Sequence, residues 1–213
     1  MNASATRKLQ LTGAAGVIEA LVDDAVLTTA QPAPRGMAII AHPHPLFGGT
    51  MDNKVVHTLA RAFVQSGWTA LRFNFRGVGA SQGVYDEGRG ELDDLLGVVA
   101  QTAPAGTLAL AGFSFGSFVV THAVRALWVQ RNIDKIVLVG AAASRFDLAP
   151  LLPDAHERSL VVHGEHDDTV PLADVMDWAR PQQLPVTVVP GGGHFFHGQL
   201  PLLRSLVARH LRA

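Results

Sequence analysis

The sequence predicts an α/β fold in which helices cover both faces of a mostly parallel, twisted sheet. Short apolar runs alternate along the chain with segments whose apolar residues recur at helical spacing, a pattern typical of β–α units. The runs IVLVG (136–140) and LVVHG (160–164) are almost continuously apolar, as expected for strands that are covered on both faces. Before this alternation, Lys8–Thr12 and Gly16–Asp23 meet at a Gly-Ala-Ala-Gly turn, which indicates an antiparallel hairpin at the N-terminal end of the sheet.

The first half of the chain supplies the next elements in order. Met37–Ala41 is a short apolar run that follows the loop QPAPRG and is expected to be a strand. The spacing of apolar residues predicts a helix over Lys54–Ser66, which Gly67 ends. A strand is then expected over Thr69–Phe75 and a second helix over Gly90–Gln101.

The second half continues the alternation. The expected strands are Thr107–Phe113, Lys135–Gly140, Ser159–His163 and Val186–Val189, and the expected helices are Gly116–Val129, Leu172–Arg180 and Gln199–Leu211. Ligands of such sheets bind at the carboxyl ends of the strands, so the residues that directly follow each strand are the first candidates for a functional site.

Composition narrows the function further. A length of 213 residues fits a single domain over residues 1–213. A net charge of −1 argues against a nucleic-acid or anionic-membrane partner, and the absence of cysteine excludes a thiol nucleophile and thiolate metal sites. The longest apolar run, Ile136–Ala143, is too short to span a membrane, and the N-terminus lacks the apolar stretch of a secretory signal. We therefore expect a cytoplasmic protein.

The strand Thr107–Phe113 runs into the sequence Gly-Phe-Ser-Phe-Gly (112–116), and a helix is expected immediately after it. A serine at the centre of G-x-S-x-G, between a strand and a helix, lies on a tight, strained turn that exposes its hydroxyl. The alternative is a glycine-rich turn with a capping serine. Ser114 is the candidate nucleophile.

A serine hydroxyl becomes a strong nucleophile only when an imidazole accepts its proton and a carboxylate orients that imidazole. The candidate base is His194, which follows three glycines after the strand Val186–Val189; His197 and His163 are the alternatives. Candidate carboxylates follow two strands. The strand Ser159–His163 is followed by three candidate acids, Glu165, Asp167 and Asp168. The strand Lys135–Gly140 is followed by a fourth, Asp147.

With these residues in place, the chain resembles the α/β-hydrolase superfamily, and in particular its small lidless members similar to dienelactone hydrolase and carboxylesterases. The resemblance extends over nearly the whole chain and rests on GFSFGS (112–117), on HPHPLFGG (42–49) and on FNFRGVGAS (73–81). The last segment is similar to the family's D-x-R-G-x-G-x-S loop, with Asn74 where aspartate is common. The chain order of nucleophile, acid and histidine also agrees.

The resemblance implies which carboxylate completes the triad. The D-x-x-V-P pattern that begins at Asp167 is similar to the family's acid loop, which favours Asp167 over Asp168, Asp147 and Glu165. The alternative role for Asp167 or Asp168 is a loop carboxylate that caps the following helix.

An oxyanion hole in this family uses two backbone N–H groups, one from the residue after the nucleophile and one from the loop after the third strand. The N–H group of the residue after the nucleophile is that of Phe115. Pro43 and Pro45 lack an N–H, which leaves His44 as the natural second donor and Leu46 as the alternative. A metal site at His42 and His44 is disfavoured, because no third ligand is evident in the sequence. No metal or cofactor is implied.

These features predict a serine hydrolase that acts on small carboxylic esters through an acyl-enzyme. A thioesterase, amidase or peptidase on the same triad, and a non-catalytic binding module, are the alternatives. Five phenylalanines near the candidate loops could line an apolar pocket or belong to the core: Phe47, Phe113, Phe115, Phe195 and Phe196.

The resemblance also bears on access to the site. Family members that act on long lipids usually carry a cap after the sixth strand. Here only residues Ala141–Arg158 separate two consecutive strands, too few for a cap domain with its own core. We therefore expect an open site without a cap.

Overall fold

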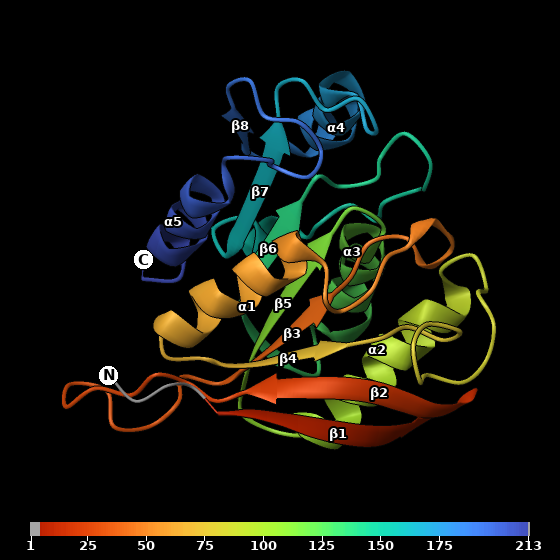
Figure 1. The fold of residues 1–213 in the computed structure, drawn as a ribbon. Helices are drawn as coiled ribbons and strands as arrows, with labels where there is room; N and C mark the ends of the chain where they lie inside the picture. The colour runs from red at the N-terminus through yellow and green to blue at the C-terminus, as the bar shows by residue number, and fades with distance from the viewer. Residues whose placement is uncertain (1–4, 213) are drawn as a thin grey trace.

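The computed structural model describes residues 5–212, which form one eight-stranded sheet with helices on both faces (Figure 1). The strands are β1 (Thr6–Gly13), β2 (Gly16–Asp23), β3 (Met37–Ala41), β4 (Thr69–Phe73), β5 (Thr107–Phe113), β6 (Asn132–Val139), β7 (Ser159–Gly164) and β8 (Val186–Val189). The helices are α1 (Lys54–Gln65), α2 (Arg89–Thr102), α3 (Phe115–Leu127), α4 (Leu172–Ala179) and α5 (Leu200–His210).

The strand order β1-β2-β4-β3-β5-β6-β7-β8 confirms the expected architecture. The hairpin of β1 and β2 is antiparallel, with Gly13 opposite Gly16, and β2 is also antiparallel to β4. All other neighbouring strands are parallel. The parallel strands therefore end at a common edge, which is the upper edge in Figure 1.

Two apolar cores lie on opposite faces of the sheet. Helices α1 and α5 cover one face, where Phe63 and Val207 are completely buried. Helices α2, α3 and α4 cover the other, where Leu95, Val120 and Val175 are completely buried. Burial on both faces explains why the central strands are apolar almost throughout.

Several strand boundaries differ from the sequence-based expectation, most of them by one or two residues. Strand β4 ends at Phe73: the backbone N–H of Asn74 still donates to the carbonyl of Glu19 on β2 (2.9 Å), but the N–H of Phe75 donates to the ring of His42 (3.0 Å) instead of a neighbouring strand. Strand β6 begins earlier than expected, at Asn132, and its pairing with β5 shifts register at Asp134, which has no partner between the pairs 108–133 and 109–135.

The asparagine that replaces the family's usual aspartate has a clear physical reason. The amide Nδ2 of Asn74 donates a 2.8 Å hydrogen bond to Oε2 of Glu19 on β2, while its Oδ1 accepts from Met51. An aspartate would place a second carboxylate against Glu19 and would provide no donor. Asn74 thus joins the hairpin to the start of α1.

The segment between β6 and β7 contains one short 3-10 helix, Pro153–Ala155, and no cap domain, as expected. Across residues 5–212, no helix combines the length and apolarity that crossing a membrane would require.

His42, directly after β3, is fully buried and is held as a neutral imidazole. Its Nδ1 donates to the carbonyl of Pro43 (2.6 Å), and its Nε2 accepts from the N–H of Phe75 (3.0 Å). Burial lowers the pKa of His42 from 6.5 to about 4, although the hydrogen bond to Pro43 partly opposes the shift. Both ring nitrogens are therefore used to hold the loop after β3.

This shift predicts a loss of stability in acid. Between roughly pH 6.5 and pH 4 the unfolded chain binds a proton on His42 that the folded chain does not, so the free energy of unfolding falls as the pH falls. At about 1.4 kcal/mol per unit, His42 should account for about 2–3 kcal/mol of the change between roughly pH 7 and pH 4. Urea denaturation of the wild type and of His42→Gln should show a smaller pH dependence in the variant. Equal pH dependence in the two proteins would contradict the assignment.

Candidate active site

Ser114 lies at the sharp turn between β5 and α3. Its backbone has φ 55° and ψ −117°, in the left-handed region that costs a non-glycine residue about 1–3 kcal/mol. The flanking glycines make the turn possible, because a Cβ atom on Gly112 would clash with the backbone of Gly116, and one on Gly116 would clash with the carbonyl of Ala41. The Ser114 N–H donates to the carbonyl of Val139 (2.8 Å), which ties the turn to β6.

The structure brings Ser114, His194 and Asp167 together from three loops that follow β5, β8 and β7. The Oγ atom of Ser114 lies 3.0 Å from Nε2 of His194, and Oδ2 of Asp167 lies 2.7 Å from Nδ1 of the same ring. Because the carboxylate can only accept, the proton of the neutral imidazole belongs on Nδ1, and Nε2 is left to accept from the serine hydroxyl. All three residues are buried.

The Asp167 carboxylate is fixed by its second oxygen. Oδ1 accepts backbone hydrogen bonds from Thr169 (3.0 Å) and Val170 (2.8 Å). Burial alone would raise the pKa of Asp167, but the hydrogen bonds from His194 and Val170 outweigh it and lower the pKa. The group therefore stays ionised at neutral pH, as required to orient a histidine.

The alternative carboxylates lie elsewhere. Asp168 is exposed and accepts a hydrogen bond from the hydroxyl of Thr169 (3.3 Å). Glu165 is exposed and accepts from the N–H of Gly191 (2.8 Å). The Asp147 side chain is also exposed, and this residue accepts a hydrogen bond through its backbone carbonyl, which lies 2.9 Å from Nε2 of His122.

The alternative histidines also occupy other positions. His197 is exposed. His163 is fully buried behind the acid, with Nε2 2.8 Å from the carbonyl of Val170 and 3.4 Å from Oδ2 of Asp167. Burial lowers the pKa of His163, so this imidazole is neutral and donates from Nε2 to the acid loop. It contacts the acid and not the serine.

Two backbone N–H groups beside Ser114 have no acceptor in the described part of the chain, those of His44 and Phe115. The alternative donor, the N–H of Leu46, is already bonded to Nδ1 of His44 (3.2 Å). Burial, followed by the positive charge of Arg145, lowers the pKa of His44 and keeps its ring neutral and able to accept this bond. Free donors at this place can stabilise a developing oxyanion.

A cavity of about 340 Å³ opens above Ser114 and His194. Of the five phenylalanines considered from the sequence, Phe47, Phe195 and the completely buried Phe115 line it, whereas Phe113 and Phe196 are completely buried and do not line it. Sequence reasoning missed Phe146 and Arg145, which also line the cavity. The signal that could have found them is their place in the loop after β6, at the same edge of the sheet.

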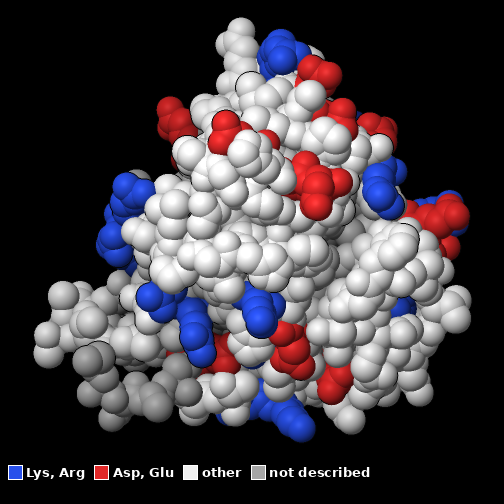
Figure 2. All heavy atoms as spheres, turned by 45° about the horizontal axis from the view of Figure 1, so that its top comes forward, with Lys and Arg blue, Asp and Glu red and all other residues white. Residues whose placement is uncertain are grey.

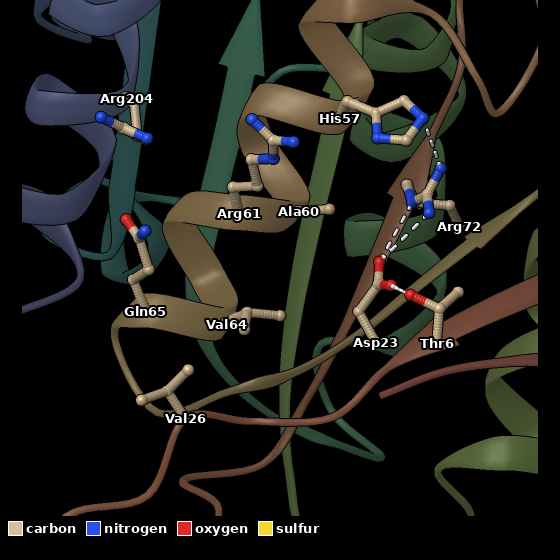
Figure 3. A pocket seen from close by; sticks show the side chains of 10 residues that line it. All are labelled: Thr6, Asp23, Val26, His57, Ala60, Arg61, Val64, Gln65, Arg72 and Arg204. Carbon is tan, nitrogen blue, oxygen red and sulfur yellow. Dashed lines mark hydrogen bonds and ion pairs between the residues drawn. The ribbon is translucent and has the colours of Figure 1, made fainter. Parts of the chain in front are cut away.

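A larger hollow, of about 540 Å³, lies over α1 away from this edge (Figure 3). The buried side chain of Arg72 in this hollow donates two hydrogen bonds to Oδ2 of Asp23 (3.2 and 3.3 Å). Its Nη1 lies 3.1 Å from Nε2 of His57. None of the residues that line it forms a serine–histidine pair. The smaller cavity is therefore the candidate active site.

The chain is similar to known proteins in sequence and in fold. A family profile described as "Alpha/beta hydrolase" matches residues 79–176. An α/β serine hydrolase without a lid from Xanthomonas campestris is 35% identical, with a TM-score of 0.85, 100% of this chain and 96% of that chain being covered. An α/β serine hydrolase homologue from Coxiella burnetii is 34% identical, with a TM-score of 0.77, and the match covers 96% of this chain and 97% of that chain. An uncharacterized protein from Rickettsia prowazekii is 33% identical over 174 residues, 75% of this chain and 71% of that protein.

Proposed function

Since the chain belongs to the α/β-hydrolase family, we propose that it is a serine hydrolase that cleaves small carboxylic esters through an acyl-enzyme. Ser114 is the nucleophile, His194 the general base and then the general acid, and Asp167 the residue that orients His194. The observation that carries the proposal is the continuous chain of hydrogen bonds from Asp167 through His194 to Ser114, at the base of an open cavity.

In the first half of the reaction, Oγ of Ser114 attacks the ester carbonyl while Nε2 of His194 takes the hydroxyl proton. The carbonyl oxygen becomes an oxyanion that accepts hydrogen bonds from the N–H groups of His44 and Phe115. When the tetrahedral intermediate collapses, the C–O bond to the alcohol breaks and Nε2 returns the proton to the leaving oxygen. The ionised Asp167 stabilises the transient imidazolium throughout.

In the second half, a water molecule replaces the alcohol. Nε2 of His194 takes a proton from the water, and the hydroxide attacks the acyl-enzyme carbonyl. The second tetrahedral intermediate collapses by breaking the bond to Oγ, and Ser114 recovers its proton from the imidazole. The products are the carboxylic acid and the alcohol.

The absence of a cap predicts selectivity for short chains. An open cavity of about 340 Å³ can cover only the first carbons of an acyl group. Each methylene that enters it adds about 0.8 kcal/mol, roughly fourfold in kcat/KM, and methylenes beyond it add little. For p-nitrophenyl esters from roughly two to sixteen carbons, kcat/KM should rise and then level off or fall within the short members.

The same series tests the proposed function when thioester and anilide counterparts of the best substrate are included. The ester should be the preferred class, and the rate should show no jump when a long ester forms micelles. A steady rise to the longest chains would instead indicate a lipase. Preference for the thioester or anilide would replace the ester assignment with a thioesterase or amidase.

A further inference from the structure

The face that carries the site is mostly uncharged, with charged side chains scattered over it (Figure 2). Of the described residues that line the site cavity, Arg145 is the only one with a permanent charge. Its guanidinium carbon lies 6.0 Å from the centroid of the Phe47 ring, on the wall of the same cavity. A lone arginine beside aromatic walls distinguishes this cavity from a purely apolar ester pocket.

The backbone holds Arg145 at this place. The N–H groups of Arg145 and Phe146 both donate to the carbonyl of Ala142, at 3.2 and 3.1 Å, which closes a tight turn just after β6. Further along, the N–H of Ala149 donates to the hydroxyl of Thr121 on α3 (3.1 Å). The arginine thus projects from a loop that is fixed at both ends.

The Arg145 guanidinium forms no ion pair with any carboxylate in residues 5–212. Glu87 and Asp147 line an adjacent hollow with it, but neither is bonded to it. Its positive charge nevertheless reaches the site, because it contributes to the lowered pKa of His44. A guanidinium that packs on a ring keeps its edge free to bind a carboxylate with two parallel hydrogen bonds.

We propose that the site prefers esters that also carry a free, ionised carboxylate, and that Arg145 binds this anion. An aromatic or short aliphatic spacer separates the carboxylate from the reacting ester carbonyl. The inference rests on the proposed function and narrows its substrate class. The aromatic residues Phe47 and Phe146 contact the spacer, and the neutral ester end lies at Ser114. Arg145 is a specificity residue and takes no part in bond making.

Two pairs of esters of nearly equal shape test the proposal, one with the charge on the acyl side and one with the charge on the alcohol side. They are p-nitrophenyl 4-carboxybenzoate against p-nitrophenyl 4-methylbenzoate, and 4-carboxyphenyl acetate against 4-methylphenyl acetate. The measurement is the ratio of kcat/KM for the anionic ester to that for its neutral partner, in the wild type and in Arg145→Gln. Comparing ratios removes intrinsic reactivity and any loss common to both esters.

In at least one pair, the ratio should fall about tenfold in Arg145→Gln, the effect of one charged hydrogen-bonded contact. It should fall further in Arg145→Glu and be partly retained in Arg145→Lys. In the wild type alone, the ratio should also decrease as salt rises from roughly 0.02 to 0.5 M. Arg125→Gln, which removes an exposed arginine on α3 that lines none of the described cavities, should leave the ratio unchanged.

Ratios that are the same in the wild type and Arg145→Gln for both pairs, or an equal drop in Arg125→Gln, would overturn the inference. In that case continued hydrolysis of the neutral esters, dependent on Ser114, would leave the proposed function standing. If no ester is hydrolysed in a Ser114-dependent way, the proposed function itself fails.

Discussion

Replacing Ser114 with alanine should abolish ester hydrolysis while the protein remains folded. The hydroxyl is the only part of the side chain that the alanine lacks, and it supplies the atom that would bond to the substrate. Loss of a triad residue typically costs about 10⁴–10⁶ in kcat, which corresponds to about 5–8 kcal/mol of transition-state stabilisation. The residual rate should come from the cavity and from the N–H groups of His44 and Phe115.

The measurement combines turnover of p-nitrophenyl acetate with labelling by a fluorophosphonate, which attaches to an activated serine. The wild type should be labelled, and peptide mapping should assign the label to Ser114. Ser205→Ala is a matched control, since Ser205 is exposed on α5 and does not line the site cavity, and it should keep both turnover and label. Near-ultraviolet circular dichroism and the urea midpoint verify that each variant is folded.

Wild-type turnover in Ser114→Ala would show that the strained turn is structural and would refute the proposed function. A label that maps to another serine would relocate the nucleophile. A variant that loses activity together with its fold would be uninformative about chemistry, so Ser114→Cys provides a second test. It keeps a nucleophilic atom at the same place and should retain labelling by a thiol-reactive acylating probe.

The sheet could be predicted from the sequence because its signals are local. Periodicity distinguishes the apolar strands from the amphipathic helix α1, and parallel strands must end at one edge. This rule brought Ser114, Asp167 and His194 into consideration without any contact information. The exact end of β4 could not be predicted, because Phe75 leaves the ladder to bond with the distant ring of His42.

The residues that the sequence did not reveal lie in an irregular loop. Arg145 and Phe146 follow β6 in a segment without periodicity, and their positions depend on a turn and on contacts with α3. Similarly, spacing along the chain cannot decide whether Asp167 or Asp168 orients the histidine, since both residues follow the same strand. Which one faces the histidine depends on side-chain hydrogen bonds that only the folded loop displays.

If Asp167 and not Asp168 orients His194, Asp167→Asn should lower kcat by about 10⁴, whereas Asp168→Asn should change it by less than about threefold. In the native site, Oδ1 of Asp167 accepts the N–H groups of Thr169 and Val170. These donors will hold the oxygen of an asparagine amide in the same place, which turns its NH₂ group toward Nδ1 of His194. The imidazole must then accept at Nδ1 and carry its proton on Nε2.

A proton on Nε2 faces Ser114, so the imidazole can no longer take the hydroxyl proton, although the geometry of the site is preserved. Asp168 is the matched control because it is the adjacent aspartate, is exposed, and has a hydroxyl partner rather than the histidine. Steady-state kinetics on p-nitrophenyl acetate, with folding verified by urea denaturation, would measure both variants. An equal loss in the two, or a larger loss at position 168, would mean that the acid loop rearranges and that Asp168 orients the base. A small loss in both would return Asp147 to consideration, with Asp147→Asn as the deciding variant.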